Sequence, residues 1–287
     1  MALYVNGEKI EESAIKEEVE QMRPHYQQVF RDQTPEEQEA RLWEWARENV
    51  IEKVLVKQAA KADPRPINPE EVEKSFKDLK KRHGGDKAFY KQLGLKPEDD
   101  PKIKEDLELQ MRVERLFKEN IKDLPEPTEE EAREYYDSHI DEFMTPEQVR
   151  AAHIVKHVDG TRSQPQAYKE ILEVQKKLEE GAIFEELADR ESDCPGNGGD
   201  LGYFTRGQMV QEFEDAVFAL QIGQVSGIIH SSYGYHIAKL YDRRPPQPIP
   251  FEQVKDQILE YLKREKEEKK NEEFIDQLKE KAVIEEK

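Results

Sequence analysis

Three side chains in the second half of the sequence could do chemistry: His153, Cys194 and His236. They do not make a metal centre, because two histidines and one cysteine lack the fourth ligand of a tetrahedral site. They do not make a cysteine protease either, since no pattern for an oxyanion hole or for an asparagine that orients the histidine is visible. A histidine on a partly apolar strand is most often a satisfied core residue, so the surrounding sequence must decide.

That surrounding sequence carries short blocks in a definite order. The blocks are Val149–Lys156 (VRAAHIVK), Ser192–Cys194 (SDC), Gly198–Phe204 (GGDLGYF), Arg206–Met209 (RGQM), Phe213–Leu220 (FEDAVFAL) and Tyr233–Ile237 (YGYHI). Each block alone is common. In this order and at this spacing they closely resemble the parvulin (rotamase, or PpiC) family of peptidyl-prolyl cis/trans isomerases. The resemblance implies an enzyme that needs no metal and no cofactor.

The reaction implied by the resemblance needs no bond to break. An X-Pro bond turns through a barrier of ~18–20 kcal/mol, because amide resonance is lost on the way. A catalyst therefore needs an apolar pocket for the proline ring and polar groups that favour the twisted amide. By resemblance, Leu201, Met209 and Phe213 form this pocket, although residue type alone would make them ordinary core. Gln208 and Tyr233 are further candidates for substrate binding, and for Gln208 a plain surface position is equally open.

The resemblance also assigns roles to the histidines and the thiol. It places His153 and His236 side by side beneath Cys194, as a hydrogen-bonded pair that fixes the ring orientation and the tautomer. Cys194 matches a position that is cysteine in some parvulins and aspartate in many others. A shared role is therefore electrostatic, beside the substrate carbonyl. Covalent attack is not required for isomerisation, and a small buried thiol is the structural alternative.

The loop after the first of these blocks bears on specificity. Parvulins that prefer phosphorylated Ser/Thr-Pro carry a basic cluster in this loop. Here the stretch 156–166 offers Lys156, His157 and Arg162, with Asp159 among them. Phosphate recognition normally needs clustered Arg or Lys, so we expect no phospho-specificity. Tyr233 stands where the phospho-specific members have a small hydroxyl residue.

The elements that must position these residues follow from periodicity. Four strands are expected, at 149–155, 201–204, 225–229 and 235–241. Helices are expected around Ala167–Leu178, around Phe184–Ala188 and around Phe213–Leu220. The order β-α-α-β-α-β-β predicts an α+β domain with an antiparallel sheet. By alternation, His153 shares a strand face with Ala151 and Val155, and His236 shares one with Ala238 and Leu240.

The rest of the chain predicts an all-α domain into which this unit is inserted. Asn6-Gly7 favours a type I′ hairpin, and amphipathic helices follow, with starts at Thr34-Pro35, Asn68-Pro69, Asp100-Pro101 and Thr128. This arrangement resembles the exported chaperones of the SurA and PrsA type. The expected domains are 1–144 (helical, chaperone-like), 145–243 (isomerase) and 244–287. The last comprises a Pro-rich linker and a helix whose apolar stripe packs back on the first domain.

Bulk properties narrow the partners. The chain has 287 residues, a net charge of −19 and one cysteine, so a nucleic-acid or anionic-lipid partner and an internal disulfide are not expected. No apolar run spans a bilayer and no signal peptide is visible. The protein is expected to be cytoplasmic, or the mature form of an exported protein. The expected partners are unfolded or proline-containing polypeptides, with a homodimer as one option.

Three functions remain after these observations. The first is an isomerase and folding chaperone acting on unfolded or partly folded clients. The second is a holdase chaperone whose isomerase is weak or idle, since isomerisation alone does not need the large helical domain. The third is a cytoplasmic maturation factor for one client, such as nitrogenase iron protein.

Overall fold

The computed structural model of the chain describes residues 2–26 and 33–287. The chain divides into two compact units, one formed by Met1–Pro127 with Glu260–Lys287 and the other by Thr128–Leu259. The long helix α10 (Phe251–Lys281) contributes residues to both.

The first unit is mainly helical and includes a small sheet. Its helices are α1 (Glu12–Tyr26), α2 (Pro35–Ala62), α3 (Pro69–Arg82), α4 (Asp86–Leu93), the 3-10 turn η1 (Pro97–Asp99) and α5 (Asp100–Ile121). Thr34 and Glu37 form the expected capping box at the start of α2, where the side chains satisfy free N–H groups of the first turn. Helix α4 was not predicted, because its eight residues bury only Phe89 and so show little periodicity.

The sheet of this unit joins the two ends of the chain. Strands β2 (Glu8–Ile10), β1 (Leu3–Val5) and β7 (Ile284–Glu286) pair antiparallel in this order. The hairpin at Asn6-Gly7 is confirmed, with φ values of 51° and 84°, as a type I′ turn requires. Leu278 and Ala282 pack against the core formed by the hairpin, α1 and α2.

The second unit holds the predicted isomerase domain. Its elements are α6 (Glu129–Ser138), the 3-10 turn η2 (Ile140–Phe143), β3 (Gln148–His157), α7 (Gln164–Glu179), α8 (Phe184–Glu191), the 3-10 turn η3 (Asn197–Gly199), β4 (Asp200–Phe204), α9 (Gln211–Phe218), β5 (Ile229–Ser231) and β6 (Gly234–Arg244). The strands form an antiparallel sheet in the order β4-β3-β6-β5. From β3 to β6, this confirms the predicted order β-α-α-β-α-β-β.

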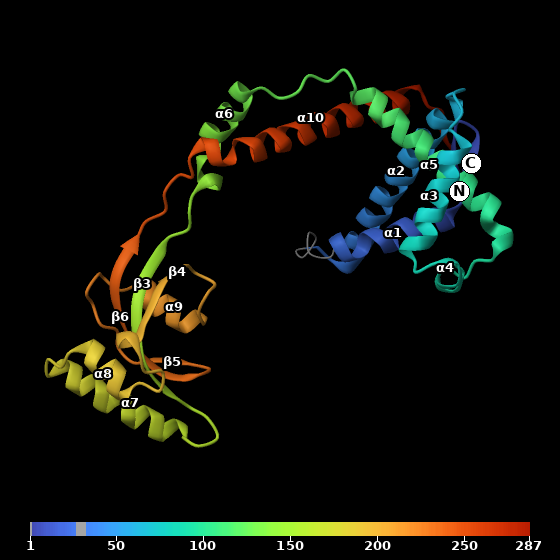
Figure 1. Ribbon diagram of the computed structural model, residues 1–287. Coiled ribbons are helices and arrows are strands. Elements are labelled where there is room, and N and C mark those ends of the chain that lie inside the picture. Colours follow the sequence, from blue (N-terminus) through green and yellow to red (C-terminus); the bar gives the residue numbers. More distant parts are fainter. Residues whose placement is uncertain (1, 27–32) are drawn as a thin grey trace. The chain divides into compact units, whose positions relative to one another are not determined.

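Helices cover both faces of this sheet (Figure 1). Helix α9 packs on the face that includes Val149, Ala238 and Leu240. Helices α7 and α8 pack on the opposite face, which includes Ile154 and Ile237. The central strands β3 and β6 are therefore buried between two apolar clusters, which fixes their register firmly.

One predicted strand is wrong. Residues 225–229 do not form a continuous strand: Val225 makes an isolated bridge with Lys239, and β5 begins only at Ile229. The reason lies at Ser226, whose Oγ accepts a hydrogen bond from the Ala238 N–H at 2.9 Å. A side chain thus takes the place of a ladder carbonyl, and the regular pairing is interrupted.

The boundaries of the compact units differ from the predicted domain limits. The second unit extends beyond 145–243, because α6 and the first turns of α10 pack within it: Tyr136 Oη donates to the Ile249 carbonyl at 2.6 Å, and its ring contacts Phe251. The functional domain limits remain a prediction. Among the described residues, no helix is both long enough and apolar enough to cross a bilayer.

Candidate active site

The two histidines lie diagonally on neighbouring strands. In the pairing of β3 with β6, His153 is opposite Ala238 and Val155 is opposite His236. Side chains directly opposite each other share a face, so His153 and His236 both lie on the face that α9 covers. Their rings stack, with centroids 5.8 Å apart and an interplanar angle of 26°. The two histidines therefore lie side by side, as the resemblance implied.

The expected hydrogen bond between the two rings is not formed in the described part of the chain. His236 Nε2 instead lies 2.7 Å from Ser231 Oγ, and its Nδ1 is buried without a partner among the described residues. An imidazolium would need acceptors at both nitrogens. Burial, followed by the other nearby histidines, lowers the pKa of His236 to about 4. Burial and then His157 also lower the pKa of His153. Both rings are neutral at neutral pH.

The expected proline pocket lies against these rings. Phe213 on α9 is 3% exposed, and its ring centroid lies 5.9 Å from that of His153 and 5.6 Å from that of His236. Leu201 on β4 and Met209, which precedes α9, are partly buried in the same cluster. The structure thus brings together the three predicted pocket residues, next to the histidine pair.

A buried carboxylate that the sequence reading missed holds this pocket in shape. Glu214 is 2% exposed and accepts hydrogen bonds from the backbone N–H groups of Gly207 at 2.9 Å and Met209 at 2.8 Å. Burial would raise the pKa of this carboxyl, but backbone donors at Gly207, Met209 and Gln208 outweigh it and lower the pKa. Glu214 therefore fixes the loop that carries Met209. The sequence shows Glu214 directly after Phe213, but the pattern of this helix was interpreted only from its apolar residues.

Gln208 and Tyr233 are both exposed. The Gln208 side chain accepts a hydrogen bond from the Thr205 N–H at 2.7 Å and so stabilises its own turn. Tyr233, 59% exposed, lies in the turn between β5 and β6. Its carbonyl accepts from the Val158 N–H at 3.0 Å and lies 3.2 Å from His157 Nδ1. The backbone of Tyr233 thus ties this turn to the end of β3.

Cys194 is placed by a segment that runs beside the end of β3. Ser192 Oγ accepts from the Val155 N–H at 3.1 Å, the Asp193 N–H donates to the Val155 carbonyl at 2.9 Å, and the Asp193 carboxylate accepts from the His157 N–H at 2.7 Å. These bonds leave the Cys194 thiol exposed. The structural alternative of a buried thiol is therefore wrong.

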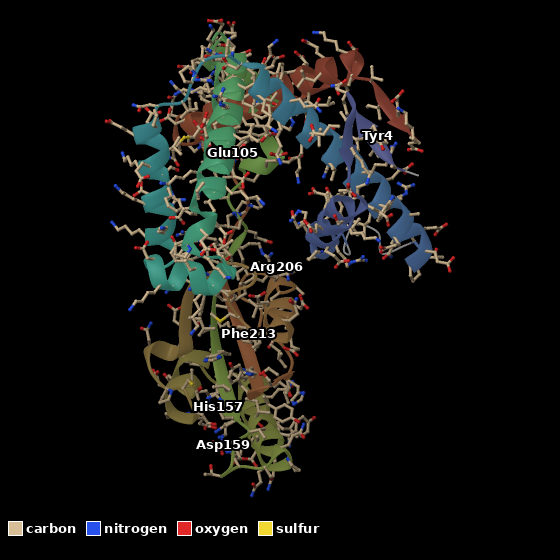
Figure 2. The ribbon with its side chains drawn as sticks, turned by 90° about the vertical axis from the view of Figure 1, so that its right-hand side faces the viewer. Tyr4, Glu105, His157, Asp159, Arg206 and Phe213 are labelled. Carbon is tan, nitrogen blue, oxygen red and sulfur yellow. The ribbon has the colours of Figure 1, made fainter. Side chains whose placement is uncertain are left out.

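The histidine that contacts Cys194 is His157, which the sequence had suggested only as part of a possible phosphate-binding loop. His157 Nε2 lies 3.4 Å from Cys194 Sγ. The signal for it was available: on an alternating strand, His153, Val155 and His157 share one face. Figure 2 shows Phe213, His157 and Asp159 in succession along the unit.

Glycine is required at one close approach in the site. Gly199, just before β4, has a φ of +76°, and a Cβ there would lie 2.3 Å from the His153 carbonyl oxygen. Any side chain would push β4, with Leu201, away from β3. The Gly-Gly-Asp block thus lets β4 pack closely against the strand that carries His153.

This arrangement combines an apolar, partly buried cluster with neutral histidines and an exposed thiol held beside a third histidine. No cluster of three or more metal-ligating side chains occurs within residues 2–26 and 33–287. The geometry suits rotation about a bound amide, since it offers apolar contact for a ring and polar atoms near one edge of the pocket.

Comparisons with known proteins match the part of the chain that carries this site. Residues 153–242 match the family described as "Rotamase: PPIC-type PPIASE domain". "Foldase protein PrsA 2" of Bacillus cereus is 34% identical over 204 residues, covering 70% of this chain and 62% of that protein. "Foldase protein PrsA" of Geobacillus kaustophilus is 33% identical over 223 residues, covering 77% and 68%.

A solved structure is also similar. The crystal structure of a peptidylprolyl isomerase (PrsA) from Bacillus anthracis is 28% identical, covering 81% of this chain and 94% of that chain, with a TM-score of 0.32. The kinship rests on the sequence relatives. The chain spans 62% of the length of the B. cereus relative and 68% of the G. kaustophilus one.

Proposed function

The chain belongs to the PrsA foldase family and carries a parvulin-type peptidyl-prolyl isomerase domain. From this premise we propose that residues 145–243 isomerise X-Pro bonds in unfolded or partly folded polypeptides. The observation that carries the proposal is the contact of Phe213 with both His153 and His236, in the apolar cluster that Leu201 and Met209 join. Such an apolar surface can hold a proline ring while the amide before it turns.

The pocket residues act by gripping the ring. Leu201, Met209 and Phe213 belong to one apolar cluster, and the thioether of Met209 adapts to the shape of the ring. The twisted amide has less charge separation than either planar form, so removal of water lowers the barrier. Catalysis requires that the site holds the twisted amide more tightly than the planar ones.

The polar residues act at the carbonyl before the proline. We assign Cys194, with His157 at 3.4 Å, to electrostatic contact with this carbonyl. His153 and His236 are assigned to positioning, because both are neutral and packed against Phe213. Tyr233 is assigned to the outer wall of the site, where its exposed ring meets the polypeptide. Gln208 stabilises the turn before Met209.

A protease-coupled isomerisation assay tests the proposal. Tetrapeptides that differ in the residue before proline are compared with the wild-type protein and with Phe213→Ala. Acceleration by the wild type that is lost in Phe213→Ala supports the assignment. No acceleration of any peptide would mean that the domain binds clients without isomerising them.

A second activity is favoured by a feature of the first unit. Helix α5 has no buried residue, and an open groove of about 710 Å³ lies between it, α2 and α10, with Val56, Leu109, Val113, Phe117 and Ile275 among its lining residues. We propose that this half-covered apolar surface holds client segments. Val113→Asp is expected to weaken the suppression of aggregation of an unfolded client, while its turnover of tetrapeptides stays at the wild-type value. Unchanged suppression would contradict the proposal.

Kinship with PrsA foldases also bears on the location that the sequence left open. Because the resemblance was to exported chaperones, we propose that the protein acts outside the cytoplasm on newly exported chains, rather than on one cytoplasmic client. Fractionation of the native host tests this, and a purely cytoplasmic pool would contradict it. A homodimer remains a prediction, to be tested by light scattering.

A further inference from the structure

Four charged side chains form a closed cluster beside Cys194. Lys156 at the end of β3 and Arg162 in the following loop both face Glu170 on α7, with Lys156 Nζ and Arg162 Nε 3.6 Å and 3.3 Å from Glu170 Oε2. Arg162 also pairs with the carboxylate of Asp193. The cluster contains two cations and two anions, so its formal charge is zero.

This cluster belongs to the site, because its members are bonded to the residues that hold the thiol. Asp193 precedes Cys194 and accepts the His157 N–H at 2.7 Å, and His157 in turn contacts the Cys194 sulfur. A charge at Arg162 is therefore separated from the thiol only by Asp193 and His157. A substrate residue next to the reacting carbonyl would meet the field of this cluster.

The loop that carries Arg162 is built to hold it in place. Asp159 Oδ1 accepts hydrogen bonds from the Thr161 N–H at 2.7 Å, from Thr161 Oγ1 at 2.7 Å and from the Arg162 N–H at 3.0 Å. These bonds close a tight turn that directs Arg162 back onto β3 and α7. The Arg162 side chain is accordingly only 26% exposed, and the Lys156 side chain is 12% exposed.

Glu170 is the acid shared by both cations. Asp193 is committed to the backbone of His157, so it has a structural task beyond its charge. Glu170 is 40% exposed and makes no other hydrogen bond or ion pair within the described residues. Its contacts cancel a positive field that would otherwise face the substrate.

We propose that Glu170 determines the charge preference of the isomerase: by occupying Lys156 and Arg162 it leaves the site without attraction for an acidic residue before proline. The inference rests on the proposed isomerase function and specifies its substrate class. Substrates are then unfolded chains with neutral or basic residues before proline. Neutralising Glu170 leaves the cluster with a charge of +1 and converts it into a weak anion site.

The matched control lies one turn further along the same helix. Glu173 is exposed on α7 and makes no hydrogen bond or ion pair in the described part of the chain. Glu170→Gln and Glu173→Gln therefore change the net charge equally and the helix sequence minimally. They differ in whether they remove the acid that Lys156 and Arg162 share.

The experiment measures kcat/KM for tetrapeptides with Ala, Glu, phospho-Ser or Lys before proline. We expect Glu170→Gln to raise the Glu/Ala ratio about fivefold, as for one partly exposed charge pair worth about 1 kcal/mol, and to lower the Lys/Ala ratio. Phospho-Ser should gain more than Glu, because it carries more charge. The change should shrink as salt is added. Glu173→Gln should keep the wild-type ratios.

The outcomes separate this inference from the function on which it rests. If the wild type accelerates Ala-Pro and both variants have the same Glu/Ala ratio of kcat/KM, only the role of Glu170 is overturned. The isomerase function then still stands. No acceleration by the wild type on any peptide would overturn the isomerase function itself. Glu170→Ala provides a second variant that removes the same charge, and its ratio must shift in the same direction.

Discussion

The two faces of the isomerase sheet bury different types of side chain. On the face covered by α7 and α8, Ile154, Ile237 and Leu187 are fully buried, and every buried member of the cluster is apolar, with Tyr235 and Tyr241 packed at its margin. On the face covered by α9, the apolar cluster is joined by His236 and Ser231, which are 5% and 4% exposed, and by the buried Glu214. One sheet thus has a face whose buried core is apolar, the apolar face, and a face whose core includes histidine, the histidine face.

The difference shows which face of the sheet lowers the free energy of unfolding of this domain. Burial of polar groups lowers stability unless they are hydrogen-bonded, and His236 Nδ1 has no partner among the described residues. The apolar face contains no such group. We infer that the apolar face supplies stability, and that the histidine face gives up part of it to shape the proline pocket.

The strongest test of this difference between the two faces is one large-to-small substitution on each face. Phe213→Ala is expected to lower kcat/KM on the order of 100-fold, because a buried Phe-sized contact is worth ~1.5–3 kcal/mol. Leu187→Ala, at a fully buried position on α8, is expected to cost about 2–5 kcal/mol of unfolding free energy. Its folded molecules should keep their activity. Urea unfolding and the isomerisation assay measure both effects.

The comparison fails if the two variants behave alike. A Leu187→Ala protein with less than a tenth of the wild-type activity per folded molecule would show that the two faces are coupled. Rates must therefore be measured at a temperature where both variants remain folded.

Much of this arrangement could be read from the sequence. Alternation on β3 and β6 placed both histidines on partly apolar faces, and the order of blocks brought Met209 and Phe213 to the same site. Gly199 was part of a recognised block. The structure explains why it is glycine: a Cβ at this position would lie too close to the His153 carbonyl oxygen. Patterns that repeat within one element are visible in one chain, because the backbone geometry fixes them.

What could not be read depends on pairing between elements. Alternation places His157 on the face of His153, but its contact with Cys194 depends on the hydrogen bonds of Asp193 to Val155 and His157, which no local pattern encodes. The same holds for His236, whose partner is Ser231 rather than His153. The interruption at Ser226 depends on a side chain that bonds to a different strand. Register between strands is a tertiary property, and one sequence does not contain it explicitly.

The next test asks whether the histidine face also contributes to folding. His153→Ala removes a ring packed against Phe213 and His236 and leaves a cavity, so we expect a loss of about 1–3 kcal/mol in unfolding free energy together with a loss of activity. Thermal unfolding and the isomerisation assay measure the two. Lost activity with an unchanged melting temperature would assign His153 to chemistry alone.

A pH series separates the two faces without mutation. The pKa of His236 is about 4 in the folded protein against 6.5 for an unperturbed histidine, and that of His153 is lowered too. Below pH 6.5 these histidines bind protons in the unfolded chain but stay largely neutral in the folded chain. Stability is therefore full above this pH and falls as pH drops toward 4, by up to about 1 kcal/mol per pH unit and group.

Urea unfolding between pH 7.5 and pH 5 measures this slope, before most carboxylates titrate. His236→Gln should flatten it, because the titrating ring is gone. The cluster of the apolar face contains no histidine, so Leu187→Ala should shift the whole curve and keep its slope over this pH range. An equal slope in the wild type and His236→Gln would contradict the assignment.

The smallest expected effect concerns the hydroxyl that holds His236. Ser231 Oγ lies 2.7 Å from His236 Nε2 and accepts the Tyr233 N–H at 3.1 Å, so Ser231→Ala leaves two polar groups without this partner. We expect a loss of about 1 kcal/mol and a few-fold lower kcat/KM, measured by urea unfolding and the isomerisation assay. Ser232→Ala is the matched control, because Ser232 is exposed and makes no hydrogen bond within the described residues. If both variants are equally stable, packing against Phe213 and His153 alone holds His236, and the histidine face is then stabilised in the same way as the apolar one.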